Sequence, residues 1–169
     1  MALAANRDQK KVGLALGGGG ARGFAHVGII KELKAAGVPV DFMTGTSMGA
    51  LVGAWYALTE DIDRLEDLFL KIRTRDIIPI RDFLGRRDGA FFGGREVDKL
   101  LAAHFGEALV EDCKIPFRAV ATDINSGEEV VINKGSLADA VRASIALPVV
   151  FSPKKIGGRL LADGGLSNP

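Results

Sequence analysis

Cysteine is nearly absent from this chain of 169 residues. The single cysteine, Cys113, excludes an internal disulfide and cannot form a cysteine-based metal cluster alone. A small secreted fold held together by disulfides is therefore excluded as well, and the sequence fits a reducing compartment.

Long apolar runs are also lacking. No segment reaches the ~20 apolar residues that a transmembrane helix needs. The N-terminal stretch MALAANRDQKK contains no apolar core of a secretory signal. We expect a cytoplasmic protein, with peripheral contact at a membrane surface left open.

Positive and negative charges nearly balance in this sequence. Lysine and arginine together number 22, aspartate and glutamate 21, and the formal net charge is +1. Because nucleic-acid binding relies on a basic surface, we expect no nucleic-acid partner. The hydrophobic share of 47% and the charged share of 25% are typical of a folded domain with a buried core.

We expect the chain to hold one domain. Its length suits a single hydrophobic core, which we place in residues 11–169 after a flexible leader at residues 1–10. The sequence stops at Pro169, directly after a glycine turn and without a closing strand or helix. The domain is therefore expected to be incomplete at its C-terminal end.

Strand-like and helix-like patterns alternate along the first sixty residues. The alternating segments are residues 11–16, 21–37, 38–45 and 47–59. This alternation predicts parallel strand pairing and an α/β fold. The later segments are a charged helical region (61–106), two strands around an Asn-Ser-Gly turn (117–133), a helix (136–147) and a hairpin (154–169).

A run of four glycines follows the first predicted strand. Gly18-x-Gly20-x-x-Gly23 fits a dinucleotide-binding fingerprint between a strand and a helix. Asp41 follows at about the ~20-residue spacing at which such folds place an acid for the ribose. A nucleotide-binding α/β module is therefore one reading of this loop.

The second strand-to-helix junction favours a different reading. Gly45-Thr46-Ser47-Met48-Gly49 is a G-x-S-x-G sequence where a strand meets a helix, the setting in which a sharp turn exposes a nucleophilic serine. The flanking glycines leave room for the neighbouring strand and helix. A helix N-terminus at Ser47 also favours developing negative charge.

Two such junctions on adjacent strands bring the glycine loop beside the serine. Backbone amides of Gly18, Gly19 and Gly20 would then form an oxyanion hole for a tetrahedral intermediate. Arg22 would steady this loop or add positive charge near a phosphorylated substrate.

A serine nucleophile needs a proton acceptor, and the two histidines are poor candidates. His26 lies on the predicted buried stripe of the first helix, which also carries Ile29, and is better explained as a packed residue. His104 precedes a glycine at a helix end, where a partial positive charge is favourable. No histidine follows residue 104, so the order of an α/β-hydrolase triad is not supported.

Carboxylates remain as candidate bases. Asp123 is explained by the turn that follows it, Asp-Ile-Asn-Ser-Gly. Asp163 follows an apolar run and precedes Gly164 and Gly165; it suits either a simple turn or a partly buried base that takes the serine proton directly.

The ordered motifs GGGGARG, GTSMG, RASIALPVVFSP and DGG resemble those of patatin-like phospholipases, specifically the compact bacterial members. The resemblance runs from about Val12 to Pro169. It implies a three-layer α/β/α fold with a largely parallel central sheet, and hydrolysis of lipid acyl esters, such as those of phospholipids and lysophospholipids, by a Ser-Asp dyad.

The resemblance also assigns roles to residues. Ser47 matches the nucleophile and Asp163 the base, and the oxyanion loop corresponds to Gly18, Gly19, Gly20, Arg22 and Gly23. Neither a metal nor an organic cofactor is implied, and no calcium requirement. The RASIALPVVFSP segment matches one that packs near the site.

A lipid substrate raises the question of membrane contact. Ile77, Ile78, Phe83, Phe91 and Phe92 are interleaved with Arg81, Arg86 and Arg87. This pattern suits an interfacial flap or, more simply, a charged connection with buried aromatic residues. The sequence leaves open the oligomeric state, the nucleotide-binding reading, and a catalytically inactive fragment.

Overall fold

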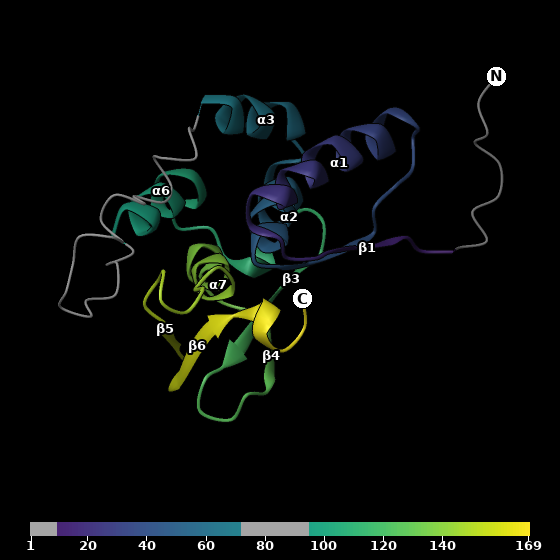
Figure 1. Cartoon of the computed structure of the whole chain (residues 1–169). Helices are drawn as coiled ribbons and strands as arrows, with labels where there is room; N and C mark the ends of the chain where they lie inside the picture. The colour runs from purple at the N-terminus through teal and green to yellow at the C-terminus, as the bar shows by residue number, and fades with distance from the viewer. Residues whose placement is uncertain (1–9, 72–94) are drawn as a thin grey trace, which may run out of the picture.

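Figure 1 shows a computed structural model of the chain, which describes residues 10–71 and 95–169. The expected leader therefore lies outside the described residues except for Lys10. The candidate interfacial flap at residues 77–92 lies wholly outside them.

The described residues form a six-stranded mixed sheet with helices packed on it. The strands are β1 (Gly13–Leu16), β2 (Phe42–Thr46), β3 (Phe117–Asp123), β4 (Glu129–Ile132), β5 (Lys154–Ile156) and β6 (Arg159–Asp163). The α-helices are α1 (Ala25–Ala35), α2 (Met48–Thr59), α3 (Ile62–Lys71), α6 (Arg95–Phe105) and α7 (Leu137–Ser144). Short 3-10 turns are η1 (Gly20–Phe24), η2 (Val110–Asp112) and η3 (Gly164–Leu166).

The sheet order is β1-β2-β3-β6-β5, and β4 pairs with β3. Strands β1, β2 and β3 run parallel, as the alternation of strands and helices predicted. Strands β4 and β6 pair antiparallel with β3, and β5 pairs antiparallel with β6. The predicted α/β class is thus confirmed, with a parallel part that contains both glycine-rich junctions.

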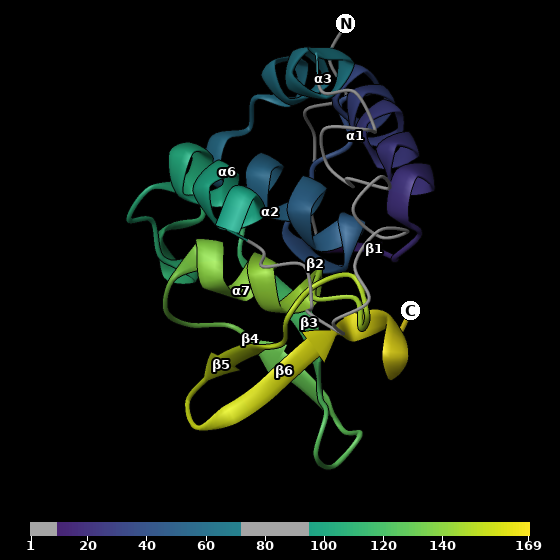
Figure 2. The same ribbon diagram turned by 60° about the vertical axis from the view of Figure 1, so that its left-hand side comes forward.

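The helices lie on one side of the sheet (Figures 1 and 2). This follows from β1, β2 and β3 being adjacent in order, because right-handed crossovers that proceed in one direction place their helices on the same face. The described part of the chain thus supplies the sheet and one helix layer. On the other face, Ala15, Phe42 and Arg118 are exposed.

Helix α2 is the central helix and is almost entirely buried. Its small residues, Gly49, Ala50 and Gly53, allow it to lie close to the strands. A Cβ on Gly53 would stand 3.0 Å from the Phe117 ring. Such close approach strengthens the packing of α2 on β1 and β3.

Two features of the first helical segment differ from the prediction. The segment begins as η1 and becomes α-helical only at Ala25, because the glycine loop turns tightly and the Arg22 N–H bonds to the Gly19 carbonyl. Ile29 is 53% exposed, whereas Val27 and Ile30 are buried. The buried face of α1 is thus rotated from the predicted stripe.

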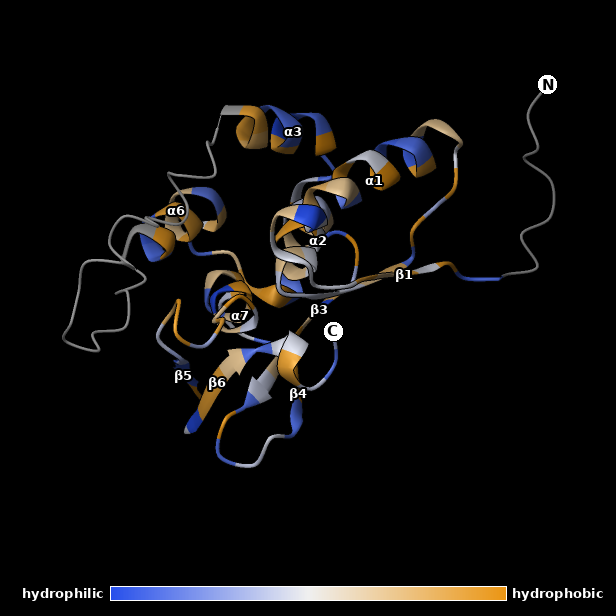
Figure 3. Ribbon diagram, in the orientation of Figure 1, coloured by the Kyte–Doolittle hydropathy of each residue, from blue (hydrophilic) through white to orange (hydrophobic). Residues whose placement is uncertain are grey.

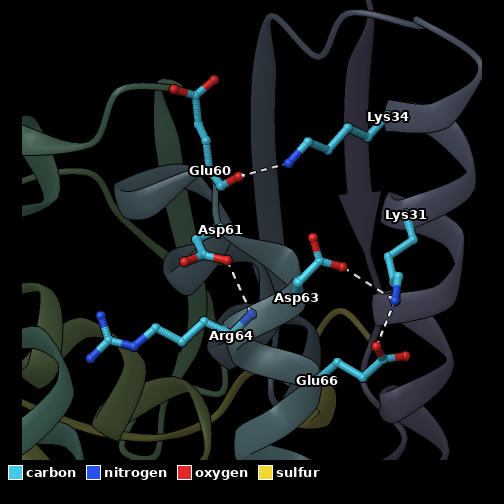
Figure 4. Close-up of polar contacts among 7 residues, drawn as sticks. All are labelled: Lys31, Lys34, Glu60, Asp61, Asp63, Arg64 and Glu66. Carbon is cyan, nitrogen blue, oxygen red and sulfur yellow. Dashed lines mark hydrogen bonds and ion pairs between the residues drawn. The ribbon is translucent and has the colours of Figure 1, made fainter.

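Helices α1 and α3 are joined at the surface by charged groups (Figure 4). Lys31 Nζ lies 2.5 Å from a Glu66 carboxylate oxygen and 3.3 Å from one of Asp63. These carboxylates raise the pKa of Lys31 through hydrogen bonds, Glu66 more than Asp63. Beneath them, Ile62 and Leu65 of α3 are buried, which agrees with the alternation of hydrophobic and hydrophilic residues along α3 in Figure 3.

Within residues 10–71 and 95–169, no helix has both the length and the apolar character needed to cross a bilayer.

Candidate active site

Ser47 lies at the sharp turn between β2 and α2. Its backbone has φ 54° and ψ −122°, a conformation that residues other than glycine rarely adopt. The neighbouring glycines explain how the turn fits: a Cβ on Gly45 would stand 2.4 Å from the Gly49 carbonyl oxygen, and one on Gly49 would stand 2.1 Å from the Leu16 carbonyl oxygen. The geometry of the predicted elbow therefore requires both glycines.

Asp163 reaches the same place from the end of β6. In the register of the sheet, Thr46 of β2 is opposite Val120 of β3, and Asp163 is opposite Ala121. Ser47 and Asp163 thus stand at the same level on either side of β3. Two strand spacings separate their backbones by about 10 Å.

The two side chains are hydrogen-bonded. Ser47 Oγ donates to Asp163 Oδ2 at 2.7 Å. Asp163 is 4% exposed, and its other oxygen, Oδ1, accepts the Gly165 N–H at 2.8 Å. The Asp163 backbone N–H in turn donates to the Ala146 carbonyl at 2.9 Å. The carboxylate is therefore fixed on both sides, with one oxygen aimed at the serine.

The glycines of the aspartate turn have distinct roles. A Cβ on Gly164 would stand 2.3 Å from the Val120 carbonyl oxygen, so this position has no room for a side chain. Gly165 supplies the N–H that holds Asp163. Thr122 supports the turn from β3, because its hydroxyl donates to the Asp163 carbonyl at 2.9 Å.

The first glycine loop lies beside the serine. A Cβ on Gly18 would stand 3.4 Å from Ser47 Cβ, and Gly19 and Gly20 have φ of 148° and 53°. Among the residues that the structure describes, no acceptor pairs with the backbone N–H groups of these three glycines. The loop thus places Gly18 directly beside the serine.

Gly23 and Arg22 stand at the far end of this loop. A Cβ on Gly23 would stand 2.4 Å from Met48 Cγ, so the second half of η1 packs directly on the residue after Ser47. The Arg22 side chain is exposed, and its backbone N–H donates to the Gly19 carbonyl at 3.1 Å. Arg22 therefore steadies the loop through its backbone.

Neither histidine is placed to accept the serine proton. His26 is half-buried, and its Nε2 lies 2.9 Å from the Gly17 carbonyl oxygen. Because a carbonyl only accepts, Nε2 must carry the proton in this bond. His104 Nδ1 bonds in the same way to the Leu100 carbonyl at 2.7 Å, and its ring packs on Trp55.

Asp41 and Asp123 have structural partners. Asp41 Oδ2 accepts the Val12 N–H at 2.7 Å, just before β1 and β2 begin. The glycine loop is at the opposite ends of these strands, so Asp41 is not placed for a ribose bound there. Asp123 accepts the Asn125 N–H at 3.0 Å, as expected of a turn residue.

Two further residues contact the site, one in α7 and one in the turn after it. Neither was assigned a role from the sequence. The Ser144 hydroxyl accepts the Ser47 backbone N–H, and the Ala146 carbonyl holds Asp163. The only sequence signal was their place in the RASIALPVVFSP segment. Among the described residues, no group of three or more histidine, cysteine, aspartate or glutamate side chains is arranged to hold a metal ion.

Several known proteins are similar to this chain in sequence. Two NTE family proteins of Mycobacterium tuberculosis are 38% identical over 159 residues (94% of this chain, 44% of the relative) and 39% identical over 168 residues (99% and 28%). The neuropathy target esterase sws of Drosophila melanogaster is 38% identical over 164 residues, which are 93% of this chain and 11% of that protein. The chain thus spans less than half the length of these relatives.

A solved structure shares the fold. The crystal structure of VipD from Legionella pneumophila matches with a TM-score of 0.61 at 16% identity, over 95% of this chain and 47% of that one. The sequence profile of the family described as patatin-like phospholipase matches residues 14–169. The chain belongs to the patatin-like phospholipase family.

Proposed function

We propose that this chain is a serine acyl hydrolase that cleaves ester bonds of phospholipids or lysophospholipids. The observation that carries the proposal is the 2.7 Å hydrogen bond from Ser47 Oγ to Asp163 Oδ2. A serine bonded directly to a buried, oriented carboxylate has its proton acceptor in place. The patatin-like phospholipase family supplies the substrate class.

In the first half-reaction, Ser47 Oγ attacks the ester carbonyl carbon while its proton moves to Asp163 Oδ2. The carbonyl oxygen becomes an oxyanion, which the N–H groups of Gly18, Gly19 and Gly20 stabilise. The N-terminal end of α2 adds a favourable dipole, which comes from its aligned peptide groups. No acidic side chain in the first turn of α2 opposes it. Collapse of the intermediate expels the alcohol, which takes the proton from Asp163.

In the second half-reaction, water hydrolyses the acyl-serine. Asp163 accepts a proton from the attacking water, the same oxyanion donors stabilise the second intermediate, and Ser47 Oγ recovers its proton as the fatty acid leaves. Both steps use one base and one set of donors. The Gly165 N–H and the Ala146 carbonyl keep Asp163 in the same orientation throughout.

Fatty-acid release from lysophosphatidylcholine and phosphatidylcholine micelles, with the 169-residue chain, tests the proposal. We expect release by the wild-type chain and none above the uncatalysed rate by Ser47→Ala. Equal release by wild type and Ser47→Ala would contradict the proposal, and so would the absence of release from every lipid ester offered. The latter result would favour an inactive fragment. Nucleotide binding by the glycine loop, by contrast, would survive Ser47→Ala.

A further inference from the structure

We propose that Ser144 is a positioning residue that holds the Ser47 backbone in its reactive conformation. This inference rests on the proposed function, because it assigns Ser144 a role in the same reaction. Ser144 accepts the backbone N–H of the nucleophile and acts through that backbone.

Ser144 connects three elements through two hydrogen bonds. Its Oγ accepts the Ser47 N–H at 2.9 Å and donates to the Val120 carbonyl at 2.6 Å. The side chain lies in the last turn of α7 and is 0% exposed. One hydroxyl thus uses its donor and one acceptor to join α7, the turn after β2, and the middle of β3.

The Ser47 backbone needs such a restraint. Its φ of 54° is strained for an L-residue, and strained conformations persist only where the surroundings enforce them. The bond to Ser144 fixes the direction of the Ser47 N–H and so opposes relaxation of the turn. It also occupies that N–H, which leaves the oxyanion to the glycine-loop donors.

The same end of α7 restrains Asp163. The Ala146 carbonyl, two residues after Ser144, accepts the Asp163 backbone N–H at 2.9 Å. Movement of α7 relative to β3 would therefore shift the serine and the carboxylate together. Loss of the Ser144 hydroxyl alone would release the serine while Asp163 stays held, which lengthens the bond between Ser47 and Asp163.

The test compares two serine-to-alanine variants on one helix. Ser144→Ala removes the contact to Ser47. Ser136→Ala is the matched control. The Ser136 hydroxyl accepts the Asp139 N–H and caps the start of α7, at the opposite end of the helix from Ser144. Loss of this cap should lower the melting temperature without touching the elbow.

The first readout is the second-order rate of fluorophosphonate labelling of the full chain, measured with the melting temperature of each variant. We expect Ser144→Ala to label about 10- to 100-fold more slowly than wild type, as for a misplaced reactive group. Ser136→Ala should label at close to the wild-type rate. In ester hydrolysis, the loss in Ser144→Ala should appear in kcat and leave KM nearly unchanged.

The second readout does not depend on activity. Amide hydrogen exchange at Ser47 should be faster in Ser144→Ala than in wild type or Ser136→Ala, because its N–H has lost its acceptor. Ser144→Cys, which keeps a weak acceptor of similar shape, should recover part of the labelling rate.

Wild-type labelling by Ser144→Ala would overturn the inference, as would equal rate losses in Ser144→Ala and Ser136→Ala. These outcomes leave labelling of the wild-type chain intact. Failure of the proposed function would be seen separately, as wild-type labelling that Ser47→Ala does not abolish.

Discussion

Ser47 Oγ and Asp163 Oδ2 are 2.7 Å apart, although 116 positions separate the two residues in the sequence. The sheet order accounts for the contact, because β3 lies between the strand that ends at the serine and the strand that ends at the aspartate. The antiparallel direction of β6 then brings its C-terminal end to the level where β2 ends. The central pair of the site is thus a product of topology.

The backbone strain at Ser47 can be measured by comparing two variants that both lack the hydroxyl. We expect Ser47→Gly to be more stable to unfolding than Ser47→Ala by about 1 kcal/mol or more, because glycine adopts a φ of 54° without a Cβ penalty. Denaturant titration of both variants gives the difference. Equal stabilities would show that the turn is not strained.

The role of Asp163 as a base is tested by Asp163→Asn. The amide oxygen can still accept the Gly165 N–H, so the fold should survive, but the amide cannot take the serine proton. We expect kcat for ester hydrolysis to fall by about 10²- to 10⁴-fold, the usual contribution of a general base. A variant with a wild-type kcat would remove Asp163 from the mechanism.

Two glycine-to-alanine changes, one in a tightly packed helix and one on an open helix face, should have opposite effects on stability. Gly49→Ala would place a methyl 2.1 Å from the Leu16 carbonyl oxygen and should cost about 3 kcal/mol or prevent folding. Gly28→Ala, in α1 where no atom lies within 4 Å of the new Cβ, should stabilise by about 0.5–1 kcal/mol. Thermal unfolding checks both, and a stable Gly49→Ala variant would contradict the described packing.

Cys113 is expected to be an unreactive thiol. Burial, and to a lesser extent Asp112, raises its pKa to about 11. At pH 8 only about one Cys113 thiol in a thousand is then ionised. The rate of alkylation by iodoacetamide should therefore rise about tenfold per pH unit up to that pKa. In denaturant the thiol should react with an ordinary pKa of about 8.5. Rapid alkylation of the folded chain at pH 7.5 would contradict this environment.

The same shift fixes the sign of a pH effect on stability. The folded chain holds the Cys113 proton more tightly than the unfolded chain, so the unfolded state ionises first. The free energy of unfolding should therefore decline as the pH rises from about 9 through about 11. A Cys113→Ser variant should lack this part of the pH dependence.

Local patterns were sufficient to predict most strands and helices. Glycine and apolar runs marked β1, β2 and α2, and the Asn-Ser-Gly turn marked the β3–β4 hairpin. The tight 3-10 turn η1 and the exposure of Ile29 were not predicted. Both depend on how the loop and α1 pack on other elements, which no short window of sequence contains.

Part of the candidate site was likewise predictable from the sequence, and part was not. Motifs in the sequence were enough to propose Ser47, Asp163 and the glycine loop. Such motifs are visible in a sequence because the close backbone approaches at these turns require glycine. Ser144 was not proposed, since a serine inside a helical pattern is uninformative until its neighbours are known. Its partners, Ser47 and Val120, lie 97 and 24 positions away in the sequence.

Fluorophosphonate labelling of the 169-residue chain, read by intact mass and peptide mapping, shows directly whether Ser47 is an activated nucleophile. We expect one adduct, on Ser47, that is lost in Ser47→Ala and forms slowly in Asp163→Asn. An adduct on another residue, or a wild-type chain that the probe does not modify, would mean that Ser47 is not activated.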